Sequence, residues 1–232
     1  MNILAVDSSS KPASSAVVKD GRLISEVFVN NSMTHSKTLM SVIDKSLEFA
    51  DITLSDIDLI ACVTGPGSFT GVRIGVACVK GLAFSSSIPC AGISALEAMA
   101  YNFCGVDAYV CAVMDARCSQ VYTALFKCDG AVVSRITPDE AISIAELCER
   151  INALEKTVYL VGDGAELVFS QYNVANDVRL SSQLLRYQRS SSAAFAAMNM
   201  NPDEYTAPEL LAPVYLRLPQ AQRELKNKLK GE

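Results

Sequence analysis

Apolar residues in this chain fall into short continuous runs and longer helical stripes, a pattern typical of strands joined by helices. The most regular example covers residues 59–84, where the uncharged run Leu59–Val63 predicts a strand that is covered on both faces. A loop with three glycines and a proline follows, and Val72–Phe84 is apolar on almost every side. The pattern therefore predicts a strand, a tight loop and a helix buried on more than one side.

The rest of the first half predicts a meander of strands and further helices. Its expected strands cover residues 3–6, 16–19, 23–29 and 88–92. An amphipathic helix is expected over 35–50 and a second helix over 94–103. Asp20 and Gly21 form the turn between two of these strands.

The second half repeats this order. Its expected strands cover residues 108–114, 121–126, 132–136 and 157–161, with a helix from Pro138 to Ile151. Asp115 follows the first of these strands as Asp7 follows the strand at 3–6, and both halves have an Asp-Gly turn. The repeat predicts an α/β protein of two similar lobes, 1–104 and 105–232, that arose by duplication, with an irregular tail on the surface.

Composition narrows the range of partners. The chain has 232 residues, a net charge of -5 and a pI near 5.0, so its own field does not favour nucleic acid. No apolar run reaches the length of a membrane span, and Met1–Val6 is strand-like and unlike a signal peptide. We expect a cytoplasmic protein that does not enter a membrane.

Cysteine and histidine usage disfavours several kinds of site. The 8 cysteines include no C-x-x-C pair, and several lie in apolar runs where reduced cysteine acts as a small hydrophobe. His35 is the only histidine, which argues against a histidine-rich metal site and leaves one base for any serine or cysteine nucleophile.

The glycine-rich loop at 64–71 has two interpretations. Free backbone N–H groups at the start of a helix can bind an anion, and glycines can equally serve a tight turn that packs a helix on a sheet. The candidate phosphate-binding residues are Asp7, Thr64, Gly65 and Gly67. Because Pro66 lacks an N–H and no lysine follows the glycines, we predict no cofactor beyond weak binding of ATP or ADP.

The run Gly65–Gly75, reading GPGSFTGVRIG, resembles the signature of the TsaB (YeaZ) family. Weaker matches in the right order cover the chain: residues 3–9, His35 with Leu39, residues 115–117 and 120–122, and residues 213–217. The resemblance implies the actin-like ATPase fold, also called the ASKHA or ribonuclease H-like fold, in which two related lobes flank a cleft.

The family resemblance also implies a function. TsaB proteins are regarded as noncatalytic scaffolds that activate TsaD, a paralogue that adds threonylcarbamoyl to adenosine 37 of tRNAs and holds a metal through a His-x-x-x-His pair. The corresponding positions here are Ala95 and Met99, neither of which offers a nitrogen ligand. The implied partners are a TsaD-like paralogue, a TsaE-like ATPase through the complex, and tRNA only indirectly.

The two apolar helices at 35–50 and 72–84 are the expected interface with that partner, and with a second copy of this chain when the partner is missing. Some of their apolar positions, Leu39 and Val76 among them, are expected to be exposed. The predicted interface residues are His35, Leu39, Val42, Ile43, Val72, Arg73, Val76, Val79 and Lys80.

Two enzyme alternatives stay open from the sequence. A small-molecule kinase of the actin-like fold would need an acidic base, for which Asp7 and Asp115 are candidates, and a second glycine-rich phosphate loop that the sequence does not show. A glycopeptidase-like metallopeptidase would need metal ligands that Ala95 and Met99 do not supply. The chain alone is therefore expected not to be an enzyme.

Overall fold

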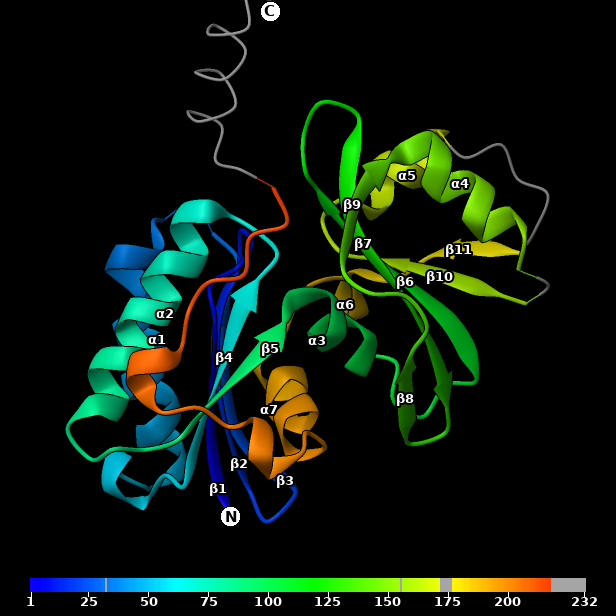
Figure 1. Cartoon of the computed structure of the whole chain (residues 1–232). Helices are drawn as coiled ribbons and strands as arrows, with labels where there is room; N and C mark the ends of the chain where they lie inside the picture. Colours follow the sequence, from blue (N-terminus) through cyan, green and yellow to red (C-terminus); the bar gives the residue numbers. More distant parts are fainter. Residues whose placement is uncertain (32, 155, 172–176, 218–232) are drawn as a thin grey trace, which may run out of the picture.

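A computed structural model describes residues 1–31, 33–154, 156–171 and 177–217. Two α/β lobes stand side by side, each built on one mixed β-sheet, with helices between them (Figure 1). Within the described ranges, no helix has the length and apolar character needed to cross a membrane.

The first lobe has the strand order β3-β2-β1-β4-β5. Its strands are β1 (Asn2–Asp7), β2 (Ala13–Lys19), β3 (Arg22–Val29), β4 (Leu59–Gly65) and β5 (Cys90–Ser94). The central β1 pairs antiparallel with β2 and parallel with β4. The helices α1 (His35–Ala50) and α2 (Phe69–Phe84) bury an apolar cluster against one face of this sheet (Figure 1).

The second lobe repeats that topology with the order β11-β10-β6-β7-β8. Its strands are β6 (Ala108–Asp115), β7 (Gln120–Asp129), β8 (Val132–Arg135), β9 (Glu140–Ser143), β10 (Val158–Val161) and β11 (Val178–Leu180). Its helices are α4 (Ile144–Asn152), α5 (Ala165–Gln171) and α6 (Gln183–Arg186). The strand pairing of β1 with β2 and β4 recurs in β6 with β7 and β10, as expected of duplicated lobes.

One predicted helix begins too early. Residues 140–143, assigned to the helix at 138–151, form β9 and pair antiparallel with β7. The helix α4 begins at Ile144, where the Ser143 hydroxyl accepts the backbone N–H of Glu146 at 3.1 Å. The partner strand β7 lies about twenty residues earlier, so local periodicity did not reveal the pairing.

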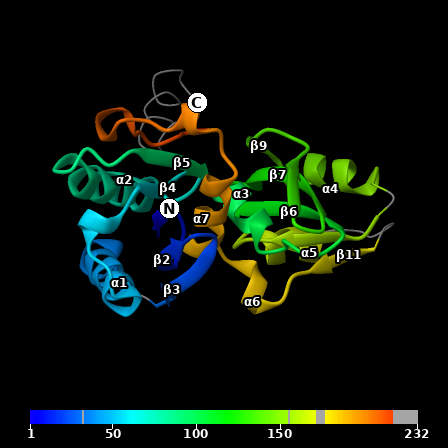
Figure 2. The ribbon, with the colours of Figure 1, turned by 90° about the horizontal axis from the view of Figure 1, so that it is seen from below.

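The helices α3 (Ala95–Tyr101) and α7 (Ser190–Met198) lie between the two sheets (Figure 2). A single apolar cluster joins them to both lobes, with Ile3 from β1 and Val110 from β6 among its members. The chain thus returns to the first sheet after Gln188, although α7 lies in the half expected to form the second lobe. The division of the chain at 104 stays a prediction.

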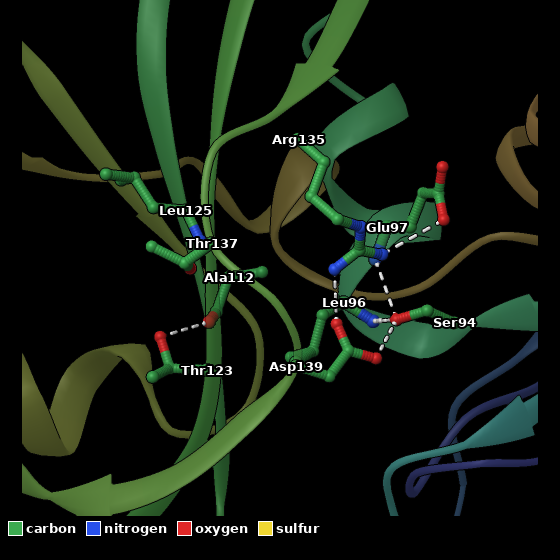
Figure 3. A network of polar contacts seen from close by, with 9 residues as sticks. All are labelled: Ser94, Leu96, Glu97, Ala112, Thr123, Leu125, Arg135, Thr137 and Asp139. Carbon is green, nitrogen blue, oxygen red and sulfur yellow. Dashed lines mark hydrogen bonds and ion pairs between the residues drawn. The ribbon is translucent and has the colours of Figure 1, made fainter. Parts of the chain in front are cut away.

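A polar network also fixes α3 to the second lobe (Figure 3). The Arg135 guanidinium donates to Asp139 at 2.5 Å and to Glu97 of α3 at 3.0 Å. The Ser94 hydroxyl donates to Asp139 at 2.6 Å and accepts the backbone N–H of Leu96. Apolar and polar contacts therefore hold the lobes together on the side where α3 lies.

The tail continues from α7 along the first lobe (Figure 1). Short 3-10 turns occur at Leu54–Asp56, Pro202–Glu204 and Pro208–Leu210. The expectation of an irregular tail on the surface agrees with residues 199–217, while the basic end from Gln220 lies outside the described residues.

Candidate functional site

A cleft of about 940 Å³ lies between the lobes. Its first wall consists of the loop after β1, the loop after β4 and the first turns of α1 and α2. The opposite wall consists of the end of β6, the turn that follows it and the loop after β10. Residues 214–217 of the tail complete the lining.

Two acidic residues of the second lobe, Asp115 and Asp163, line this cleft. Asp163 accepts the Ser10 hydroxyl of the first lobe at 2.9 Å and the backbone N–H of Asp115 at 3.2 Å. Surrounding protein atoms disfavour the charged form and raise the pKa of Asp163. Asp163 was not among the residues predicted for the site, although it follows the predicted strand at 157–161 after a single glycine.

Asp7 lies behind the cleft and does not line it. Its side chain is 3% exposed, with Oδ1 accepting the backbone N–H of Ser9 at 2.7 Å. The other oxygen, Oδ2, is buried and has no hydrogen-bond partner among the residues that the structure describes. Desolvation therefore raises the pKa of Asp7. Ser9 and Ser10 stand between this carboxyl group and the open space.

The glycines of the loop after β4 allow close packing against the loop after β1. A Cβ atom on Gly67 would overlap the carbonyl oxygen of Ser9, and one on Gly71 would overlap that of Ser8. The backbone N–H of Ser68 donates to the same Ser9 oxygen at 2.6 Å. These contacts support the tight-turn interpretation of the loop, because the glycine faces are already occupied by protein.

The tail covers two of the predicted phosphate-binding residues. The carbonyl oxygen of Thr64 accepts the backbone N–H of Val214 at 2.8 Å. Gly65 lies beneath Val214, whose carbonyl oxygen is 2.6 Å from where a Cβ atom on Gly65 would be. Of the four predicted residues, only Gly67 lines the cleft. Asp7, Thr64 and Gly65 do not line this cleft, and the predicted phosphate-binding role of the four residues stays a prediction.

The basic residues of the cleft come from three segments. Lys11 follows β1, Arg117 follows β6 and Arg217 lies at the end of the described tail. Arg217 donates to the carbonyl oxygen of Ala116 at 2.6 Å. His35, the predicted helix-start residue, also lines the cleft, and its Nε2 is 2.8 Å from the carbonyl oxygen of Ser10. In this arrangement, both histidine and Arg217 hold loops of the cleft in place.

The two positions that the family resemblance matches to metal ligands lie in the apolar core. Ala95 and Met99 of α3 are fully buried in the cluster shared by the lobes. The Met99 sulfur lies close to Gly162, where an added Cβ atom would approach it at 3.0 Å. Among the residues the structure describes, no group of three or more potential metal ligands comes together.

The predicted interface residues do not form one exposed surface. The aliphatic members are at most 4% exposed and pack beneath α1 and α2: Leu39, Val42, Ile43, Val72, Val76 and Val79. The expectation that Leu39 and Val76 are exposed is therefore wrong. Their helix faces point toward the sheet, since each helix buries its most aliphatic stripe.

The exposed surface of these helices consists of other residues. Met40 is 46% exposed, and Ala77 and Gly81 are also exposed. Cys78 and Ile74 are partly exposed beside them, with the Cys78 sulfur 3.0 Å from the Met40 sulfur. We call these five residues the α1–α2 face. Arg73 and Lys80, which were also predicted at the interface, contact the tail.

Comparison with known proteins relates this chain to a protein family. The model of the family "TsaD: tRNA N6-adenosine threonylcarbamoyltransferase" matches residues 24–224. The chain is 32% identical to the TsaB protein of Bacillus subtilis, over 72% of this chain and 73% of that protein. It is 29% identical to the TsaB protein of Escherichia coli, over 98% of this chain and 100% of that protein. Both relatives are named as tRNA threonylcarbamoyladenosine biosynthesis proteins.

The fold comparison agrees with the sequence comparison. The structure of YeaZ from Pseudomonas aeruginosa superposes with a TM-score of 0.80 at 25% identity, covering 93% of this chain and 99% of that chain. The likeness therefore includes both lobes and the helices between them. The two-lobed architecture is that of the actin-like fold.

Proposed function

The chain belongs to the TsaD family and, within it, to the TsaB group, and from this we propose that it is a noncatalytic subunit in the biosynthesis of threonylcarbamoyladenosine in tRNA. The observation that carries this proposal is the match over nearly the full length of TsaB from Escherichia coli. The proposed reaction is the transfer of threonylcarbamoyl to adenosine by a TsaD-like partner, which this chain activates.

The core around α3 supports a noncatalytic role. Ala95 and Met99 occupy the positions of the TsaD metal ligands, and both side chains pack in the core between the lobes. A methyl group and a thioether are poor ligands for a hard divalent ion. Catalysis of the transfer therefore belongs to the partner in this proposal.

The cleft supports at most weak binding of ATP or ADP. The tail covers Thr64 and Gly65, and the glycines at 67 and 71 face the carbonyl groups of the loop after β1. A nucleotide phosphate would meet the carboxylates of Asp115 and Asp163 in the cleft without a lysine in the glycine loop to balance the charge.

We propose that the α1–α2 face binds the TsaD-like partner, and binds a second copy of this chain in its absence. Ala77 and Gly81 lie one turn apart on the exposed side of α2, so another helix can approach the backbone closely there. Met40 and Ile74 add apolar surface next to them. A TsaE-like ATPase and tRNA would then meet this chain through the complex, which we place in the cytoplasm.

Light scattering after size-exclusion chromatography tests this surface. In the Ala77→Glu variant, a charge replaces a methyl group at the centre of the face, so we expect loss of the homodimer and at least tenfold weaker partner binding. Met198→Glu is the matched control, because Met198 is 38% exposed at the end of α7, on the other side of the first sheet.

Both variants should keep the wild-type thermal unfolding midpoint to within a few degrees, since neither position is buried. If Ala77→Glu remains dimeric and binds the partner like the control, the interface lies elsewhere. The substitutions Leu39→Asp and Val76→Asp are unsuitable for this purpose, because they place a charge in the core.

A further inference from the structure

The tail from Thr206 to Arg217 contacts the first lobe at successive points. Thr206 exchanges two backbone hydrogen bonds with Cys90 of β5, at 2.9 and 2.8 Å. Leu211 is 4% exposed and belongs to the apolar cluster beneath α2. Figure 1 shows the segment, in orange to red, following α2 and then turning toward the second lobe. The segment is thus attached along its length and does not hang free.

Two cationic side chains of α2 hold the tail. The Lys80 Nζ donates to the carbonyl oxygens of Glu209 at 2.9 Å and Leu211 at 3.2 Å. About two helical turns earlier in α2, Arg73 Nε donates to the Tyr215 hydroxyl at 2.7 Å. The Arg73 guanidinium also lies 3.8 Å from the centre of the Phe69 ring, which packs on Tyr215 at 5.0 Å. Any shift of α2 therefore displaces the tail as well.

The end of the described tail reaches the second lobe. Arg217 Nη1 donates to the carbonyl oxygen of Ala116 at 2.6 Å, in the turn after β6. The next three residues, 117–119, all have left-handed backbone conformations with φ of 62°, 55° and 54°. Non-glycine residues in this region are strained, so the turn needs contacts that hold it. The Arg217 hydrogen bond is one such contact from outside the lobe.

The tail and the shared core lie at different places along the boundary between the lobes. The core around α3 and α7 joins the sheets continuously, whereas the tail crosses at the cleft, where Ser10 and Asp163 supply a further hydrogen bond. A rotation about α3 and α7 would open or close the cleft and stretch the Arg217 contact first. We propose that residues 206–217 are a strap that sets the opening of the cleft and links it to the position of α2.

This linkage has a consequence that rests on the proposed function. The α1–α2 face and the strap share the helix α2, with Ala77 on the exposed side and Arg73 and Lys80 bonded to the tail. A partner that docks on the face and moves α2 transmits that movement to the turn after β6. The coupling is reciprocal. Partner binding changes the equilibrium between the open and closed cleft by some factor, and opening the cleft changes the affinity for the partner by that same factor.

Amide hydrogen exchange on the full chain tests the strap directly. We expect the Arg217→Ala variant to exchange roughly tenfold faster in peptides that contain Ala116 and Gln120, whose backbone N–H groups are hydrogen-bonded within the turn. Peptides of α3 should be unchanged. Arg179→Ala is the matched control, because within the described part of the chain this arginine bonds to Asp177 and Tyr159, both in the second lobe.

The strap is refuted if the Arg217→Ala variant leaves exchange in the turn at the wild-type rate, or accelerates exchange equally throughout the chain. A second variant, Tyr215→Phe, removes the acceptor of the Arg73 hydrogen bond and keeps the ring contact with Phe69. It should accelerate exchange in the same peptides to a smaller degree. No acceleration in this variant would separate α2 from the strap and contradict the linkage.

Addition of a purified TsaD-like partner separates this inference from the proposed function. Partner binding should slow exchange in the turn of the wild-type chain, and slow it less in Arg217→Ala. If no partner binds, the proposed function is refuted. Amide exchange in the isolated wild-type and variant chains still tests whether residues 206–217 act as a strap. If the partner binds and protects the turn equally in both proteins, the link to α2 is refuted.

Discussion

The residue Asp7 illustrates how a buried carboxyl group affects stability. Its Oδ2 has no hydrogen-bond partner in the described ranges of the chain, and desolvation raises its pKa above the usual 3.8. The folded chain therefore retains this proton at pH values where the unfolded chain has released it. By linkage, the Asp7 contribution to the free energy of unfolding falls as the pH rises from about 4 through the folded-state pKa.

We predict that Asp7→Asn raises the free energy of unfolding at pH 7, because a neutral amide replaces a buried carboxylate and keeps an oxygen for the Ser9 N–H. The gain should shrink as the pH approaches 4, where Asp7 itself becomes neutral. Urea denaturation of both proteins at several pH values measures this. A variant that is less stable than the wild type at pH 7 would show that the carboxylate is stabilised by a group we have not identified.

Individual burial was harder to predict than the helices themselves. The apolar stripe of α1 and the apolar character of α2 were read correctly, yet Leu39 and Val76 were expected at the surface. In α2, nearly every position is apolar or small, so the sequence period does not distinguish the covered face from the exposed one. Only contact with β1 and β4 assigns Val76 to the core and Ala77 to the surface.

At the scale of elements, the strand, loop and helix at 59–84 were predicted in the right order, although β4 extends two residues beyond Val63 and α2 begins at Phe69, before Val72. The loop glycines gave no sign of their neighbours, because Ser8 and Ser9 lie about sixty residues earlier in the chain. The strand β9 and the contacts of the tail were not predicted for the same reason, because their partners are distant in the sequence. Local sequence patterns indicate where strands, loops and helices lie, whereas the contacts of each loop depend on residues far away in the sequence.

Two glycines of α2 provide a matched test of the packing role. In Gly71→Ala, the new Cβ atom would overlap the carbonyl oxygen of Ser8, so we expect a loss of ~2 kcal/mol or more in the free energy of unfolding. Gly81 has no atom within 4 Å of an added Cβ atom. At a protein concentration low enough to keep the chain monomeric, Gly81→Ala should therefore stabilise the helix by ~0.5–1 kcal/mol.

Urea denaturation at this low protein concentration compares the two glycine variants. Equal effects of the two substitutions would contradict the packing role of Gly71. At a higher protein concentration, where the proposed homodimer on the α1–α2 face forms, Gly81→Ala should lose this gain, because the added methyl group meets the second copy.

For the whole molecule, the duplication was visible because both halves repeat the order of strands, acidic residues and turns. The repeat correctly predicted the shared topology of the two sheets. It did not predict that α7 and the tail return to the first lobe, because the strands that both segments contact there are distant in the sequence. The helix α7 completes the core between the lobes, and residues 214–217 of the tail complete the lining of the cleft.

The central claim is that this chain activates a TsaD-like enzyme without catalysing the transfer itself. The most direct measurement is mass spectrometry of nucleosides from unmodified tRNA incubated with a threonylcarbamoyl donor and the purified proteins, singly and together. We predict threonylcarbamoyladenosine at a substantial rate only when both proteins are present, and little stimulation by Ala77→Glu. Modification by this chain alone, or an undiminished rate with the partner alone, would contradict the claim.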